Sequence, residues 1–262
     1  MQVARQARIA CLLLPGIGTA DDLRAISDVG VSIARIATHC TEADIAQQHI
    51  GLARELGMEA VGFLMMAHMV SPEELLAQAR IMQDAGADLV YCVDSAGALT
   101  TPEVRDRIGA MAAGLDIGVG MHAHENLSLS VANSLTALEA GATHIDCCAA
   151  GAGAGAGNCP TEIFLTVCQK MGIETGVDAF AVTDVAQDVV RPALRRPQVV
   201  DRAALILGYA GVYGSFLLHS ERAAERYGVS QAEILLELGR RKMVGGQEDM
   251  IIDVALELAA RK

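Results

Sequence analysis

The chain has 262 residues, of which 52% are hydrophobic and only 3% aromatic, and its formal net charge is −12. The acidic balance disfavours nucleic-acid phosphates and anionic membranes, and the scarcity of aromatic side chains disfavours base stacking. No apolar stretch approaches the roughly 20 residues that span a bilayer. We therefore expect a cytoplasmic protein that acts on a small molecule, with no nucleic-acid or membrane partner.

Short apolar runs alternate with helical stretches along the first part of the chain. The runs are mostly apolar on both faces, which is typical of buried parallel strands. They cover residues 7–14, 32–39, 59–66, 88–94, 117–122 and 144–150. Polar residues follow the ends of several successive runs, which favours a TIM-type (β/α) barrel over an open doubly wound sheet. The sequence thus predicts an incomplete barrel, with roughly six of the eight strands that close this fold.

After Pro160 the pattern becomes entirely helical. The expected helices cover residues 161–171, 178–190, 201–207, 215–227, 230–241 and 248–260. Arg191-Pro192 and the turn at residues 195–197 are expected to separate the strand-bearing part from the helical appendage. We predict a partial barrel catalytic domain over residues 1–175 and a helical appendage, for communication or docking, over residues 176–262.

His122 and His124 end the fifth apolar run. In an extended chain, residues i and i+2 point to the same face, so the two imidazoles would leave the strand together. A pair of neutral imidazoles is a good beginning for a metal site. The alternative is a pair of hydrogen-bonded structural histidines.

Other polar residues near the predicted strand ends have more than one interpretation. Asp94 ends the fourth run and could complete a metal site, although a helix N-cap or a partner for a ligand is favoured. His39 and His68 are candidates for acid–base chemistry, with structural roles preferred. Asn126 could hold the loop after the histidines through side-chain to backbone hydrogen bonds.

The glycine-rich segment 151–158 could hold a phosphate, but ordinary turn geometry explains it equally well, and a dinucleotide-binding fold is disfavoured by the barrel pattern. Seven cysteines contain no Cys-x-x-Cys pair. Most of them lie in apolar strand-like or helical runs, so we expect reduced thiols.

Several long motifs, in order, resemble the 4-hydroxy-2-oxovalerate aldolases, within the broader group of 3-hydroxy-3-methylglutaryl-CoA lyases and isopropylmalate synthases. The motifs include LLLPGIGTADDL (12–23), RIATHCTEAD (35–44), VDSAGALT (93–100), HAHENLSLSVANS (122–134), LGYAGVYGSF (207–216) and MVGGQEDMIIDVAL (243–256). The resemblance covers essentially the whole chain.

The resemblance implies an aldolase of aromatic or steroid catabolism that cleaves 4-hydroxy-2-oxopentanoate into pyruvate and acetaldehyde with Mn²⁺, or with Mg²⁺ or Co²⁺. It implies that His122 and His124 bind the metal, that His122 and Ser95 contact the substrate, and that Tyr213 is a catalytic and substrate-binding residue. It also implies an acylating acetaldehyde dehydrogenase as partner, and a homo-oligomer, either a dimer or a heterotetramer with that enzyme.

The sequence departs from the family at one place. The resemblance implies two further βα units at the N-terminal side, with an Arg-Asp-Gly motif that supplies the third metal ligand, and this motif does not occur in the chain. We expect either a fragment of a longer protein or a degenerate gene product. The alternatives to the aldolase are another barrel lyase or acyl-CoA condensing enzyme, and an inactive scaffold that binds the dehydrogenase.

Overall fold

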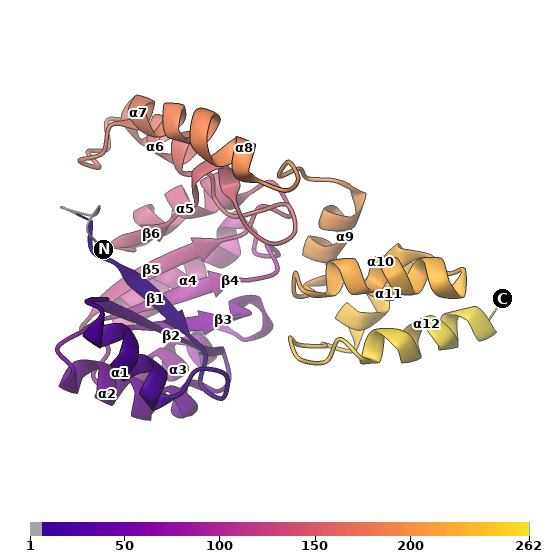
Figure 1. Cartoon of the computed structure of the whole chain (residues 1–262), viewed down its shortest axis with the longest axis horizontal. Helices are drawn as coiled ribbons and strands as arrows, with labels where there is room; N and C mark the ends of the chain where they lie inside the picture. The colour runs from indigo at the N-terminus through magenta and orange to yellow at the C-terminus, as the bar shows by residue number, and fades with distance from the viewer. Residues whose placement is uncertain (1–6, 262) are drawn as a thin grey trace. The chain divides into compact units, whose positions relative to one another are not determined.

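Six parallel strands form one sheet in a computed structural model that describes residues 7–261 (Figure 1). The strands are β1 (Ala10–Leu13), β2 (Ile33–His39), β3 (Glu59–Met65), β4 (Leu89–Asp94), β5 (Gly118–Ala123) and β6 (His144–Asp146). They are neighbours in chain order, from β1 at one edge to β6 at the other. An open doubly wound sheet would reverse this order at a switch point. The predicted incomplete TIM-type barrel is confirmed.

The chain divides into two compact units. The first comprises residues 7–93, 102–121 and 136–145 among those described, and the second comprises residues 94–101, 122–135 and 146–261. Residues 1–6, which fall in the predicted barrel domain, lie outside the described residues. Among the residues described, no helix is long and apolar enough to cross a membrane.

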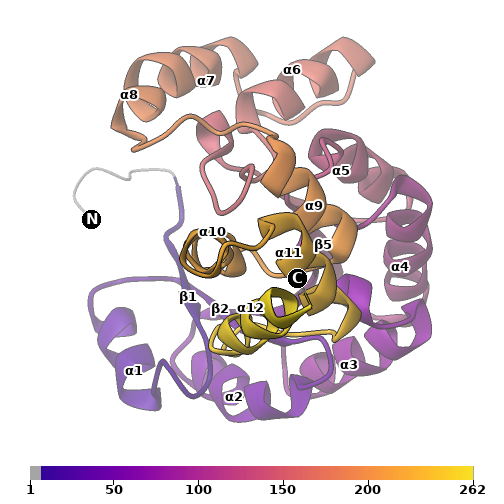
Figure 2. The same cartoon turned by 90° about the vertical axis from the view of Figure 1, so that its right-hand side faces the viewer.

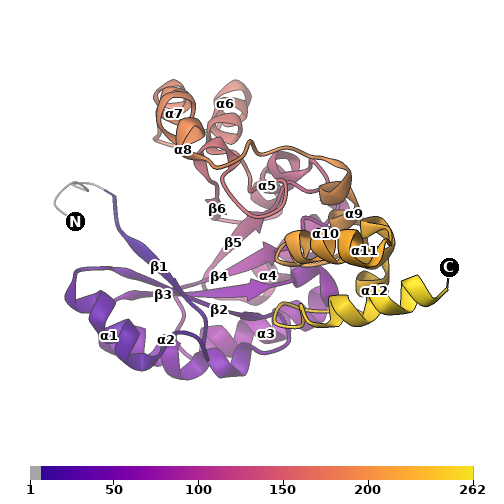
Figure 3. The ribbon, with the colours of Figure 1, turned by 45° about the vertical axis from the view of Figure 1, so that its right-hand side comes forward.

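The helices of the first unit cover the outer face of its strands (Figures 2 and 3). They are α1 (Ala20–Asp28), α2 (Gln47–Glu55), α3 (Pro72–Asp84) and α4 (Thr101–Gly114). Thr19 and Ser71 begin α1 and α3 with capping boxes, in which a hydroxyl accepts from the third helical residue and that residue's carboxylate accepts from the cap. These caps satisfy amides that the helix itself leaves unpaired.

Large side chains fill the inner face of the first unit. The Phe63 and Tyr91 rings have centroids 5.6 Å apart, and the Arg35 guanidinium lies 4.5 Å and 5.1 Å from those centroids. Tyr91 also lies against Gly120, where an added Cβ would be 2.5 Å from the ring. A glycine on β5 is therefore what admits the tyrosine, and the charged guanidinium is held over two aromatic faces.

The second unit is mainly helical and has its own core. Its helices include α6 (Thr161–Met171), α7 (Ala179–Val185), α8 (Arg191–Ala193), α9 (Arg202–Ala210), α10 (Phe216–Tyr227), α11 (Gln231–Arg240) and α12 (Met250–Ala260), while α5 (Ser130–Glu139) begins in this unit. The last four form a bundle around fully buried Phe216, Ile234 and Leu238. These bounds lie within a few residues of the helices expected from the sequence.

Two local expectations were wrong. The sixth strand was expected to extend to residue 150 but ends at Asp146, because a 3-10 turn follows at Ala149–Gly151 and Ala150 adopts a positive φ of 57°. The helix expected over residues 178–190 was expected to end there, but α8 follows directly and Pro192 lies in its first turn. A π-helical turn at Ala186–Val190 precedes it, and this wider winding accommodates the proline.

Candidate metal and substrate site

His122 and His124 lie side by side where β5 ends. Their ring centroids are 5.2 Å apart and the ring planes are inclined by 65°. The extended backbone continues past β5, because His124 forms an antiparallel bridge with Asn158. The spacing of two residues therefore places both imidazoles on one face, as the sequence predicted.

Asp146 at the end of β6 holds His122. One carboxylate oxygen of Asp146 lies 3.0 Å from His122 Nδ1, and both side chains are mostly buried. A carboxylate at Nδ1 favours the tautomer that carries its proton there, so that Nε2 keeps its lone pair. Asp146 is a functional candidate that was not singled out from the sequence, because its role depends on the adjacency of β5 and β6.

The His124 imidazole is deeply buried. Burial, together with the neighbouring His122, lowers its pKa to about 3, against an opposing backbone hydrogen bond at Ala154. The ring is therefore neutral at physiological pH, which is the form that binds metal ions. Its Nδ1 is buried and has no hydrogen-bond partner among the described residues.

These two histidines fit a divalent metal ion as two of its ligands. His124 has a neutral ring and a buried Nδ1 with no partner among the described residues, and His122 has a carboxylate behind its ring. These features suit a pair of metal ligands. Within residues 7–261 no group of three or more histidine, cysteine, aspartate or glutamate side chains is arranged to hold a metal. The described part of the chain thus brings together two candidate ligands for a metal ion.

Asp94 has a structural role in the loop after β4. Its two carboxylate oxygens accept hydrogen bonds from the backbone amides of Ala98 and Leu99, at 2.9 Å and 3.1 Å. The side chain is fully buried, so these bonds compensate for its desolvation. These bonds hold the loop and do not cap a helix, because α4 begins only at Thr101. Ser95 follows directly and is also buried.

His39 and His68 lie in the first unit. His39 Nδ1 is 2.7 Å from the Thr41 hydroxyl, and burial lowers the pKa of His39. The backbone carbonyl of His68 is 3.5 Å from a guanidinium nitrogen of Arg107, whose side chain also donates to Ala67 and Val70. The backbone at His68 is thus part of a structural network.

The glycine-rich loop folds upon itself. Ala156 donates its amide to the Asn126 side chain, and the same side chain donates to the Ala96 carbonyl. The Gly157 and Asn158 amides bond to carbonyls within the loop. Because these amides are used internally, turn geometry accounts for the glycines. Asn126 joins this loop to the loop after β4, rather than holding only its own loop.

Tyr213 lies between α9 and α10 and is partly buried. Burial raises the pKa of its phenol, and the nearby Glu248 carboxylate raises it further. The next residue, Gly214, is so close to the glycine-rich loop that an added Cβ would be 3.1 Å from Ala154 Cβ. Gly214 and His124 therefore both lie next to Ala154 of the glycine-rich loop.

Two family models match this sequence, and together they cover most of it. Residues 1–189 match the model described as HMGL-like, and residues 198–260 match the DmpG-like communication domain. A 4-hydroxy-2-oxovalerate aldolase from Carboxydothermus hydrogenoformans is 59% identical over 98% of this chain and 77% of its own length. The chain belongs to the 4-hydroxy-2-oxovalerate aldolase family. The resemblance seen in the motifs is thereby confirmed.

Other comparisons agree with this family. The protein named 4-hydroxy-2-oxovalerate aldolase 1 from Nocardia farcinica is 61% identical over 98% of this chain and 75% of its own length. A structure of a pyruvate carboxylase variant from Rhizobium etli superposes with a TM-score of 0.81 over 99% of this chain and 29% of that chain, at 13% identity. The second likeness shows the barrel fold alone.

Proposed function

We propose that this member of the 4-hydroxy-2-oxovalerate aldolase family cleaves 4-hydroxy-2-oxopentanoate to pyruvate and acetaldehyde. The observation that carries the proposal is the partly buried pair His122 and His124, with Asp146 behind the first ring, in a chain about 60% identical to proteins named for this aldolase. Two imidazoles on one face form an incomplete ligand set that suits a divalent ion.

Mn²⁺ is the metal we propose, with Mg²⁺ or Co²⁺ as substitutes. A bound divalent ion would polarise the 2-oxo acid and stabilise the negative charge that develops as the carbon–carbon bond breaks. His122 and His124 would hold the ion from this chain. His122 is also proposed to border the substrate, while Asp146 fixes the direction of its ring through the 3.0 Å contact.

Ser95 and Tyr213 are the proposed substrate contacts. Because burial raises the pKa of Tyr213, its phenol is protonated at neutral pH and can donate a hydrogen bond to a substrate oxygen. Ser95 follows Asp94 at the end of β4, and its buried hydroxyl can donate or accept. Ends of successive parallel strands are where barrel enzymes assemble their sites, which supports this assignment.

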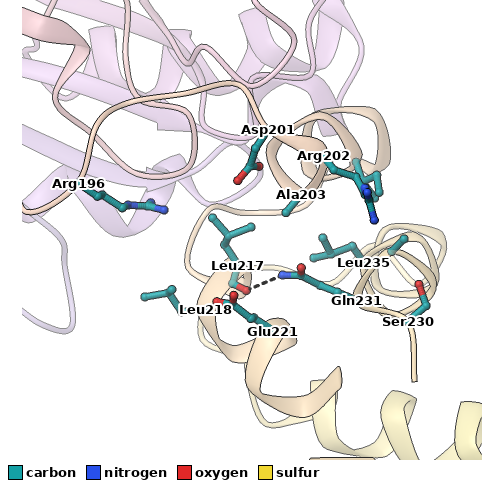
Figure 4. A pocket seen from close by; sticks show the side chains of 12 residues that line it. Arg196, Asp201, Arg202, Ala203, Leu217, Leu218, Glu221, Ser230, Gln231 and Leu235 are labelled. Atoms are coloured by element: carbon teal, nitrogen blue, oxygen red, sulfur yellow. Dashed lines mark hydrogen bonds between the residues drawn. The ribbon is translucent and has the colours of Figure 1, made fainter. Parts of the chain in front are cut away.

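We further propose that the helices after residue 198 bind an acylating acetaldehyde dehydrogenase. The residues matching the communication domain expose several large apolar side chains: Val199, Leu205, Tyr209, Leu218, Leu236, Ile252 and Leu256. A hollow between α9, α10 and α11, bordered by Arg196, Asp201 and Glu221, adds a site for an inserted side chain (Figure 4). Exposed apolar groups with a polar rim are typical of protein interfaces. The assembly would be a dimer or a heterotetramer.

The test is turnover by the full chain with Mn²⁺ and 4-hydroxy-2-oxopentanoate, followed by reduction of the pyruvate formed with lactate dehydrogenase and NADH. We expect metal-dependent activity that His122→Ala lowers by at least about 100-fold, since a ligand is lost. Phe180→Ala, at an exposed position of α7, is the control variant.

Parallel assays distinguish the rival activities. Turnover of oxaloacetate or an acyl-CoA, with none of the 4-hydroxy acid, would instead identify another barrel lyase or condensing enzyme. Calorimetric titration with Mn²⁺ tests the inactive scaffold: heat of binding that disappears in His122→Ala supports the metal enzyme. Dehydrogenase binding with neither Mn²⁺ affinity nor turnover would establish a scaffold.

A further inference from the structure

Two cysteines face each other where the chain returns to the sheet after the glycine-rich loop. Cys148 and Pro160 form a parallel bridge, in which Cys148 N donates to Cys159 O and Thr161 N donates to Cys148 O. Cys147 and Cys159 precede the bridged residues on the two segments. Side chains alternate along extended backbone, so these two lie opposite each other on the face away from Cys148.

The environment of the two thiols matches this register. The Cys147 thiol and the Ser134 and Ser130 hydroxyls are the side-chain neighbours that act on the Cys159 sulfur. The Cys147 thiol holds the pKa of Cys159 below its usual value, against the opposing effect of burial, whereas Cys159 and burial raise the pKa of Cys147. Cys148 is engaged elsewhere, since its sulfur accepts from Asn158 Nδ2 at 3.1 Å.

Accessibility differs between the two cysteines in a useful way. Cys159 is fully buried, whereas Cys147 is partly exposed. An external reagent can therefore reach Cys147 first, while Cys159 lies behind it as the resolving thiol. Neighbouring backbones in a parallel pair also lie within the range of Cα separations that a disulfide spans, about 4.4–6.8 Å.

We propose that Cys147 and Cys159 are a reversible modification site that forms a disulfide with a low-molecular-weight disulfide as oxidant. Cys147, which gives up its proton to the neighbouring Cys159 thiolate, attacks one sulfur of the oxidant and releases one thiolate, which leaves a mixed disulfide. The Cys159 thiolate then attacks the Cys147 sulfur and releases the second thiolate. The two cysteine protons pass to the released thiolates, so two protein thiols are oxidised and one disulfide is reduced to two thiols.

The bond would close a ring around the glycine-rich loop. Residues 148–158 lie between the two sulfurs, and these include Ala156, whose amide donates to Asn126. Cys147 also follows Asp146 directly, so the ring would restrain the backbone of the carboxylate that contacts His122. Oxidation would thus stiffen the segment on which the site is built.

The experiment treats the full chain with oxidised glutathione, denatures it and alkylates the remaining thiols. We expect the number of alkylated cysteines to fall from seven to five, with the mass of an internal disulfide and no bound glutathione. Fragmentation of the peptide between Glu139 and Glu162 should show Cys148 alkylated and the other two protected. Dithiothreitol should restore all seven.

Variants provide matched controls. Cys148→Ser should still form the bond, whereas Cys147→Ser and Cys159→Ser should each retain six alkylated thiols or carry one glutathione. The wild-type map does not depend on the folding of any variant. Protection of Cys148 with either neighbour, a glutathione that stays attached to Cys147, or seven alkylated thiols after oxidation would overturn the proposal.

Discussion

Asp146 is a positioning residue, and its effect should appear in metal affinity. Replacing it in Asp146→Asn removes the charge at His122 Nδ1 while keeping the size of the side chain. We expect Mn²⁺ affinity to fall by about 10–100-fold, the usual cost of losing a partner of a metal-bound histidine. Calorimetric titration measures this directly.

The control for this variant is Asp253→Asn, an exposed aspartate on α12. It changes the net charge by the same amount and should leave Mn²⁺ affinity unchanged. Equal affinity in Asp146→Asn and the wild-type chain would show that the contact with His122 does not support the metal site.

Individual site residues differ in how far the sequence predicts them. The spacing of His122 and His124 is enough to predict that their rings lie together, because side chains alternate in an extended chain and both rings fall on one face. Asp146 is many positions further on, and its contact requires knowledge that β5 and β6 are neighbours. Tyr213 was assigned only through the family resemblance, and its role and that of Ser95 stay predictions.

At the scale of elements, the glycine-rich loop should be intolerant of side chains. In Gly157→Ala the new Cβ would be 2.1 Å from the Gly151 carbonyl oxygen, and the backbone has a φ of +107°. Both clash and strain oppose the substitution, so we expect the free energy of unfolding to fall by at least about 3 kcal/mol. Urea denaturation followed by circular dichroism measures the loss.

A substitution at Gly172 tests backbone strain without a steric clash. It ends α6 with a φ of +75°, but an added Cβ would meet no atom within 4 Å. Gly172→Ala should therefore cost only about 1 kcal/mol, the penalty of the left-handed conformation. Similar losses in the two variants would show that the loop relaxes around a side chain.

The ion pairs that join α11 to α12 should respond to acid. Glu237 accepts from Arg240 and Arg241, which lowers its pKa to about 2, and Arg241 also bonds to Glu257. A carboxyl whose pKa is lower in the folded state stabilises the fold above its unfolded pKa of about 4.3. That contribution is lost as the pH falls from about 4.3 toward 2.

Glu237→Gln should therefore lower the free energy of unfolding at neutral pH, by about 0.5–1 kcal/mol, and have little effect near pH 2. Urea titrations at both pH values measure the difference. Glu233→Gln, on the exposed side of the same helix, serves as the control and should show no such dependence. A constant deficit at both pH values would contradict the ionic origin.

Elements were easier to predict than their ends. Alternating apolar runs and helical stretches identify the strands and the late helices, because burial on both faces leaves a clear pattern. The end of β6 was missed because Ala149–Gly151 is apolar like the strand before it, although its backbone turns. At Pro192 the helix was predicted to end too early, since nothing in the sequence reveals the π-helical turn that accommodates the proline.

At the scale of the whole molecule, assembly with a dehydrogenase should depend on the exposed apolar groups of the helical bundle. Tyr209 on α9 is 80% exposed. Tyr209→Glu should weaken binding of an acylating acetaldehyde dehydrogenase by about 30-fold or more, as expected for an aromatic residue at an interface centre. Surface plasmon resonance measures the affinity. Ile45→Glu, at an exposed position in the first unit, should bind normally, and equal loss in both would refute a specific surface.

One packing arrangement also limits how sequences of this family can vary. It consists of Arg35, Phe63, Tyr91 and Gly120. The arginine rests on two rings, one of which occupies the space that a side chain on β5 would need. Four strands therefore share one packing arrangement, and no single position can change size alone. Among homologues these positions should covary: a larger residue in place of the glycine requires a smaller aromatic partner, and loss of the rings removes the support for a half-buried guanidinium.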